Sequence, residues 1–194
     1  MKKIKDPIVL GVVAGLAGNI IKNIGNEISI LLGFSKITYA EIAGGIYMKK
    51  KATRTPLGKA IGYLGDNAIG GALGIGFVYV LKATGKDHAI MKGVGYSHLA
   101  WTALLGGINK VGISSFQPPD TKTVLSSYIN HTLFGLTVAV TATTFGDKDL
   151  FPQEDIQVNK AGYFNYPRSR GLRFLRKDKA INTDIDEQIA PNEH

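Results

Sequence analysis

The chain alternates long apolar segments with short polar ones. Four segments reach the roughly 20 mainly apolar residues that a helix needs to cross a bilayer, and they cover residues 8–32, 57–81, 89–111 and 124–145. A soluble helix of this length carries charges on its wet face every few residues. The fourth segment contains no Asp, Glu, Lys or Arg at all. The pattern predicts an all-α, polytopic membrane protein built as a bundle of four transmembrane helices.

A fifth apolar segment, residues 37–48, lies between the first two spans. It is too short to cross a bilayer and is followed by three lysines, 49–51. We expect a short interfacial or re-entrant helix whose lysines lie at the lipid headgroups. Pro56 suits the first turn of the second span, and Asp120 or Thr121 suits the cap of the fourth.

The net charge of +8 belongs to the predicted membrane domain. Residues 1–145 carry +9 (15 basic, 6 acidic) and residues 146–194 carry −1 (8 basic, 9 acidic). Basic residues that flank apolar runs suit anionic lipid headgroups, so the bilayer and not nucleic acid is the expected partner. There is no cysteine, which excludes disulfides and thiolate metal sites. Residues 1–5 resemble the start of a signal peptide, but the run behind them has full span length, so we expect a retained helix.

The character of the chain changes after residue 146. We therefore divide it into a transmembrane domain, residues 1–146, and a polar, partly disordered tail, residues 147–194. The tail contains a basic cluster: Arg168, Arg170, Arg173, Arg176 and Lys177. Two interpretations stay open for this cluster. It belongs to a mobile segment, or it contacts an anionic membrane surface or a partner.

One face of the first span is small and polar throughout. At 100° per residue, about a third of the helix circumference holds Gly11, Gly15, Gly18, Asn19, Lys22, Gly25, Asn26 and Ser29. Lipid offers no hydrogen bonds, so this face must meet protein or water. On the second span, Gly58, Gly62 and Gly65 share one side, and glycines at such spacing let helix backbones approach closely.

The charged residues of the first two spans fall at similar depths. With a rise of about 1.5 Å per residue, Lys22 and Asp66 both lie a few ångströms from the midplane, on the same side. A lone charge there is costly, so we predict a Lys22–Asp66 ion pair. We define the polar seam as the predicted intramembrane polar residues: Asn19, Lys22, Asn23, Asn26, Asp66, Asn67, His98, Asn130 and His131. Asn19, Asn23, Asn67, Asn130 and His131 are the expected hydrogen-bond partners of the pair.

Several segments carry a resemblance to a known family. They are residues 6–19 (DPIVLGVVAGLAGN), 36–43 (KITYAEIA), 54–58 (RTPLG), 77–81 (FVYVL), 84–87 (TGKD) and 92–95 (KGVG). Over residues 1–146 the chain resembles the uncharacterised small four-helix integral membrane proteins of spore-forming Gram-positive bacteria. The resemblance implies a multi-pass protein of the bacterial cytoplasmic membrane, and it implies no activity or cofactor.

Two functions fit these patterns. The first is a structural or interaction subunit of a homo-oligomer or a larger membrane complex. The second is a small ion, proton or solute channel or transporter that uses Lys22 and Asp66, with His98 and His131 as further titratable groups. Potential metal ligands are present without a metal-site spacing: Glu27, Asp66, His98 and His131. No catalytic motif is found, so an enzyme is not expected. If the polar face of the first span packs against protein, transport loses its path.

Overall fold

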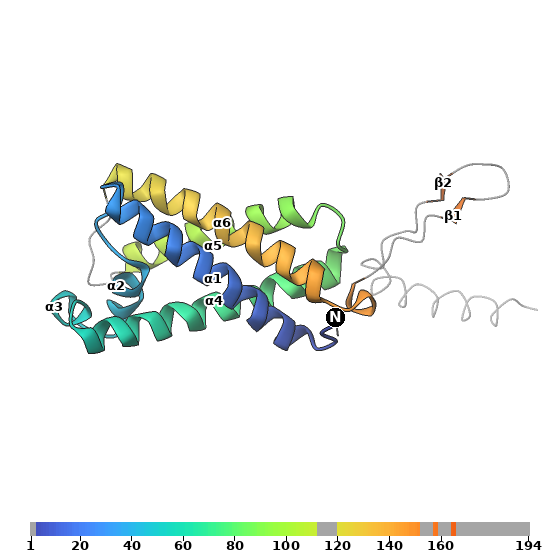
Figure 1. Ribbon diagram of the computed structural model, residues 1–194. Coiled ribbons are helices and arrows are strands. Elements are labelled where there is room, and N and C mark those ends of the chain that lie inside the picture. Colours follow the sequence, from blue (N-terminus) through green and yellow to red (C-terminus); the bar gives the residue numbers. More distant parts are fainter. Residues whose placement is uncertain (1–2, 112–119, 152–156, 159–163, 166–194) are drawn as a thin grey trace, which may run out of the picture. The chain divides into compact units, whose positions relative to one another are not determined.

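The computed structural model describes residues 3–111, 120–151, 157–158 and 164–165. The chain divides into two compact units, residues 1–153 and residues 154–194. The second unit contains strands β1 (Gln157–Val158) and β2 (Phe164–Asn165), which pair antiparallel with Gln157 opposite Asn165. The first unit is helical and contains the whole candidate site (Figure 1).

Four long helices agree with the four predicted segments to within a few residues. They are α1 (Pro7–Leu31), α4 (Pro56–Thr84), α5 (Ala89–Val111) and α6 (Thr121–Phe145). Two short helices, α2 (Tyr39–Gly44) and α3 (Lys50–Thr53), lie between α1 and α4, and a 3-10 turn, η1 (Lys148–Leu150), follows α6. The all-helical prediction is confirmed. The short helix predicted over residues 37–48 is present as α2, which covers only part of that range, and α3 follows it.

Local sequence explains where the long helices begin. Asp6 accepts hydrogen bonds from the backbone N–H groups of Ile8 and Val9 ahead of a proline in the first turn of α1. Thr55 caps α4 in the same way, with Pro56 in the first turn. Asp120, and not Thr121, caps α6 by accepting from the backbone of Thr123. Each cap satisfies donors that the first helical turn leaves free.

Helix α1 lies between α4 and α6 and runs antiparallel to both. Gly11 of α1 meets Ile75 and Gly15 meets Gly70, so α1 and α4 run in opposite directions. Gly18 likewise meets Val138 and Gly25 meets Asn130 of α6. Helix α5 packs mainly on α6, and α2 packs on α4 (Figure 1). Helices α4 and α6 make little contact with each other. The bundle is therefore a row in which α1 and α6 are central, and α2 fills space beside them.

The apolar core lies at the end of the bundle where the chain begins. Ile4 pairs with Gly146 beyond the end of α6, and Leu10, Phe77, Phe134 and Val138 are buried together. Phe151 belongs to the same core and is also buried. The helical unit therefore extends past the predicted boundary at residue 146, because an aromatic side chain beyond it returns to the core.

Two helices, α1 and α4, are long and apolar enough to cross a membrane among the residues that the structure describes. Helices α5 and α6 are 23 and 25 residues long, but hydroxyl, amide and imidazole side chains along them lower their apolar character. The test by length and composition thus supports two of the four predicted spans. Some of these polar side chains, among them Ser97, Asn130 and His131, are buried inside the bundle.

Candidate functional site: a buried polar seam

Close contact between α1 and α4 brings the seam residues of the two helices together. A Cβ atom added at Gly15 would collide with the carbonyl oxygen of Gly70, and one added at Gly11 would collide with the backbone of Ile75. From the other side, a Cβ at Gly74 would collide with the carbonyl oxygen of Gly11. Backbone-to-backbone packing of this kind needs glycine at each position, and it holds the polar faces of α1 and α4 in register.

The remaining glycines predicted to pack do so against three helices and the turn between α2 and α3. Gly18 meets the side chains of Phe134 and Val138 on α6. Gly58 and Gly62 meet the backbone of α3 and α2 respectively, and Gly65 faces the Tyr47 ring. Packing glycines missed from the sequence are Gly70, Gly74, Gly93 and Gly135. The pattern that could have identified them is a small residue at every third or fourth position. In this glycine-rich chain the same pattern includes glycines that pack against nothing, such as Gly95 and Gly106.

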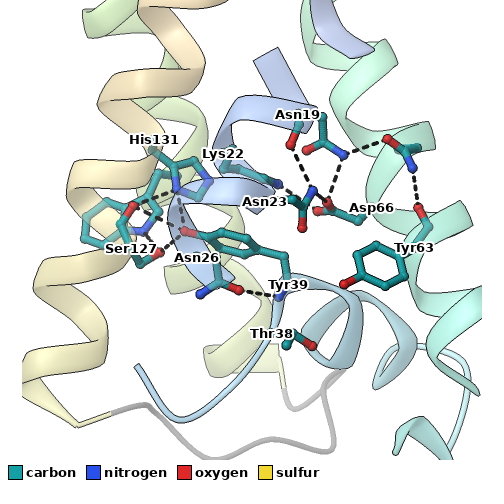
Figure 2. A network of polar contacts seen from close by, with 12 residues as sticks. Asn19, Lys22, Asn23, Asn26, Thr38, Tyr39, Tyr63, Asp66, Ser127 and His131 are labelled. Carbon is teal, nitrogen blue, oxygen red and sulfur yellow. Dashed lines mark hydrogen bonds and ion pairs between the residues drawn. The ribbon is translucent and has the colours of Figure 1, made fainter. Parts of the chain in front are cut away.

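Lys22 and Asp66 form the predicted ion pair at the centre of the seam. Lys22 Nζ lies 2.7 Å from Asp66 Oδ1, and the two side chains are 7% and 8% exposed. The second carboxylate oxygen, Oδ2, accepts from Asn19 Nδ2 and Asn23 Nδ2, each at 2.8 Å (Figure 2). Three donors thus converge on one carboxylate. This geometry offsets much of the cost of burying the charge.

Amide side chains extend the network along α1 and α4. Asn19 Nδ2 also donates to Asn67 Oδ1 at 2.9 Å, and Asn67 Nδ2 donates to the carbonyl oxygen of Tyr63. Asn19 is fully buried, yet within the described structure its Oδ1 atom has no hydrogen-bond partner. Leaving a buried amide oxygen unpaired costs free energy comparable to a lost hydrogen bond. Asn19 Oδ1 is therefore an acceptor beside the ion pair that could take a further donor.

Helix α2 supplies a residue that sequence reasoning missed. The Tyr39 ring lies beneath the ammonium group of Lys22, whose Nζ is 4.3 Å from the ring centroid. The backbone N–H of Tyr39 donates to Asn26 Oδ1 at 3.2 Å. Figure 2 shows Tyr39 between α1 and α6, with Lys22 above it. The Tyr39 side chain, at the start of α2, is therefore buried inside the helical unit.

Polar contacts hold α2 in this position. Thr38 and Glu41 form a capping box, in which the Thr38 side chain accepts from the backbone of Glu41 and the Glu41 side chain accepts from the backbone of Thr38. Glu41 is buried and pairs with the more exposed Arg54, Nε to Oε1 at 3.2 Å. These local contacts fix the start of α2 and so fix the Tyr39 ring.

Helix α6 contributes the opposite wall of the seam. His131 Nδ1 lies 2.9 Å from the carbonyl oxygen of Ser127, which requires the proton on Nδ1. The Ser127 hydroxyl lies 3.2 Å from the Tyr39 hydroxyl and accepts from Trp101 Nε1 at 3.0 Å. Asn130 donates to Ser126. Neither Asn130 nor His131 has a hydrogen bond to Lys22 or Asp66. His131 lies on the far side of the Tyr39 ring, and Asn130 lies against Gly25 of α1.

His98 belongs to a separate contact between α5 and α6. Its Nε2 lies 3.1 Å from the Thr132 hydroxyl, and its ring stacks on Tyr128 with centroids 3.9 Å apart. His98 Nδ1 is buried and has no partner in the described part of the chain. The structure therefore brings Asn19 and Asn23 to the Lys22–Asp66 pair as predicted. Asn67 joins the network only through Asn19, and His98 lies apart from it.

No group of three or more His, Asp or Glu side chains suited to a metal ion occurs within residues 3–111 and 120–151. The basic cluster Arg168, Arg170, Arg173, Arg176 and Lys177 lies outside the described residues. Comparison of the chain with protein-family models, with curated proteins and with solved structures finds no match. The geometry of the seam is therefore the basis on which a function can be assigned.

Proposed function

We propose that the chain is a four-span protein of the bacterial cytoplasmic membrane. Each long helix presents large apolar side chains outward, and the most exposed include Leu31, Leu57, Leu64, Met91, Leu99 and Leu125. Charged and amide side chains lie inside instead, among them Asn19, Lys22, Asp66 and Asn130. A soluble bundle shows the opposite distribution. The resemblance seen in the sequence supports the bacterial membrane as the location.

Within that membrane, the function we favour is that of a structural or interaction subunit. The observation that carries it is the burial of the seam inside a single chain: Asn19 is 0%, Lys22 6% and Asp66 5% exposed. The polar face of α1 packs against α4 and α6 through glycine contacts, and Lys22 and Asn26 on it contact Tyr39 of α2. A path for solute along this face would require the same surface to be wet.

A groove between α1 and α4 is the surface on which we place a neighbouring helix of a second copy. Its volume is about 400 Å³, and it is lined by Val12, Leu16, Asn67, Ala68, Gly71, Ala72 and Ile75. A Cβ atom at Gly71 would meet nothing within 4 Å. Small residues that face outward allow another helix to approach closely, whereas Gly74 on the same helix is already occupied by α1.

The two glycines provide a matched test of the subunit function. Gly71→Leu fills the groove without a clash inside the chain, so we expect the folded protein to lose its oligomeric mass in detergent or nanodiscs. Gly74→Leu strikes the backbone of Gly11 and Gly15 and should unfold the chain instead. Native purification with identification of co-purifying chains completes the test. A wild-type monomer that carries no partner chain contradicts the subunit function.

Transport is the alternative, and the ionisable pair at membrane depth is the observation that favours it. Ion flux into liposomes reconstituted with wild-type protein and with Asp66→Asn distinguishes the two. A transporter carries flux that Asp66→Asn abolishes. A structural subunit carries none, and Asp66→Asn changes only its stability or assembly.

A further inference from the structure

The surroundings of the Lys22 ammonium group have the composition of a cation-binding site. On one side is the Asp66 carboxylate, 2.7 Å from Nζ, and on the other is the face of the Tyr39 ring, 4.3 Å from Nζ. Proteins that bind organic ammonium ions place aromatic faces against the charge, and here the Asp66 carboxylate adds a counter-ion. We name the space that the Lys22 side chain fills, between the four residues Asn19, Asn23, Tyr39 and Asp66, the Lys22 chamber.

The rest of the chamber is polar but neutral. Asn19 and Asn23 both donate to Oδ2 of Asp66, so that oxygen is satisfied without a cation, and Oδ1 is left to the ammonium group. His131 lies beyond the Tyr39 ring, with centroids 5.5 Å apart, and its Nδ1 is committed to Ser127. The chamber therefore holds one carboxylate and requires one positive charge.

The chamber also has an acceptor that the fold does not use. Asn19 Oδ1 is fully buried and unpaired in the described structure, next to the carboxylate that its own amide nitrogen contacts. A primary ammonium group has three N–H donors. In the described structure, Lys22 Nζ donates a hydrogen bond to Asp66 Oδ1. A free ammonium ion, which has no tether to α1, can orient its donors toward more than one acceptor.

We propose that the Lys22 chamber is a binding site for a primary alkylammonium ion, and that the Lys22 side chain is its built-in occupant. This inference goes beyond the subunit function, because it assigns a ligand class to the seam whether or not the chain oligomerises. Replacing Lys22 by alanine removes three methylene groups and the amine. The space that remains matches n-propylammonium, with its charge at the position of Nζ.

The experiment is chemical rescue of Lys22→Ala in detergent. We expect the variant to melt below wild type, because Asp66 is left buried without its counter-ion. Added n-propylammonium should raise its melting temperature with saturation, by about 3–6 °C at ten times the dissociation constant. Equal concentrations of 1-propanol, which has the shape without the charge, and of sodium chloride, which has the ionic strength, should not.

Two variants separate binding in the chamber from general effects of the amine. Lys22→Ala with Asp66→Asn has no carboxylate to satisfy, so propylammonium should leave its melting temperature unchanged. The melting temperature of wild type should also stay unchanged, because the Lys22 side chain already fills the chamber. If Lys22→Ala does not fold alone, purification with propylammonium present should recover it and dialysis should unfold it. Failure to respond to the amine in either format, or an equal response of the three proteins, overturns the proposal.

Discussion

Gly93 of α5 and Gly135 of α6 each lie against the carbonyl oxygen of the other. A Cβ atom added at either glycine would collide with the partner's oxygen. Beside this contact, the Ser97 hydroxyl donates to the carbonyl oxygen of His131 at 2.7 Å. Helix α5 packs mainly on α6 and only weakly on α4. The glycine crossing is therefore part of the interface that holds α5 in the bundle.

Gly93→Ala should therefore destabilise the bundle although alanine favours helix. The methyl group must push the backbones apart, which we expect to cost about 1–3 kcal/mol, as overpacking does elsewhere. Gly95→Ala is the matched control on the same helix, because a Cβ there meets nothing within 4 Å. Gly95→Ala should leave stability unchanged or raise it by up to about 1 kcal/mol, because only the helix preference of alanine acts there. Unfolding in mixed detergent micelles measures both, and equal effects of the two substitutions would contradict the packing argument.

The Lys22–Asp66 pair should behave as one unit in a double-mutant cycle. Removing either partner leaves a buried charge, so Lys22→Met and Asp66→Asn should each cost about 3–5 kcal/mol. The double substitution leaves no charge and should cost clearly less than the sum. Unfolding free energies of the four proteins in mixed micelles give the coupling energy. Additive costs would mean that the two charges do not stabilise each other in the folded chain.

The sequence was enough to predict this pair, because the constant rise of a helix fixes the depth of each residue along a predicted span. A constant rise per residue was enough to place Lys22 and Asp66 at one level, and the cost of a lone charge in lipid required them to meet. The same arithmetic identified Gly11, Gly15 and Gly18, which lie on one helical face. Features that repeat with helical periodicity and face a uniform apolar medium are visible in a single sequence.

The part of the site that was missed depends on the path of a connection. Tyr39 reaches Lys22 because α2 turns into the bundle, and a six-residue helix has too little periodicity to reveal which way it turns. Its ring then separates His131 from the ion pair, so the hydrogen bond predicted from His131 does not form. Contacts made by short connecting segments follow from tertiary packing, which the pattern of one chain does not encode locally.

A pH dependence is expected where the loop after α1 meets the start of α6. Asp120 accepts from Lys36, Nζ to Oδ2 at 2.8 Å, and from the backbone of Thr123. The Lys36 ammonium group and the cap lower the pKa of Asp120 to about 2. An unfolded aspartate has a pKa of about 3.9. Because the folded value is the lower one, the carboxylate stabilises the fold above about pH 4, and that contribution is lost between about pH 4 and pH 2.

Asp120→Asn isolates this contribution, since asparagine also caps helices but carries no charge. Wild type should unfold at higher denaturant than Asp120→Asn at neutral pH, and the difference should shrink as the pH falls through that window. Lys36→Ala should narrow the window by raising the pKa of Asp120. The observation that would count against the argument is a difference between wild type and Asp120→Asn that stays constant from pH 7 to pH 2.

The hydroxyl and the ring of Tyr39 should contribute separately to stability. Tyr39→Phe removes the hydroxyl that lies 3.2 Å from Ser127 Oγ and keeps the aromatic face under Lys22, so it should cost about 0.5–1.5 kcal/mol. Tyr39→Leu also removes that face from a desolvated ammonium group, which should cost about 2 kcal/mol more. Unfolding in mixed micelles compares the two variants with wild type. Equal costs would show that the ring–ammonium contact contributes nothing.

The same pair of proteins gives a second pH test at the alkaline end. Burial raises the pKa of Tyr39 to about 12, whereas an unfolded tyrosine ionises near pH 10. Because the folded pKa is the higher one, the neutral phenol contributes its full stability below about pH 10, and this contribution is lost as the pH rises toward 12. Tyr39→Phe cannot ionise at this position. The stability difference between wild type and Tyr39→Phe should therefore move in favour of phenylalanine between pH 10 and pH 12, and a difference independent of pH would mean that the Tyr39 hydroxyl is exposed to water in the folded protein.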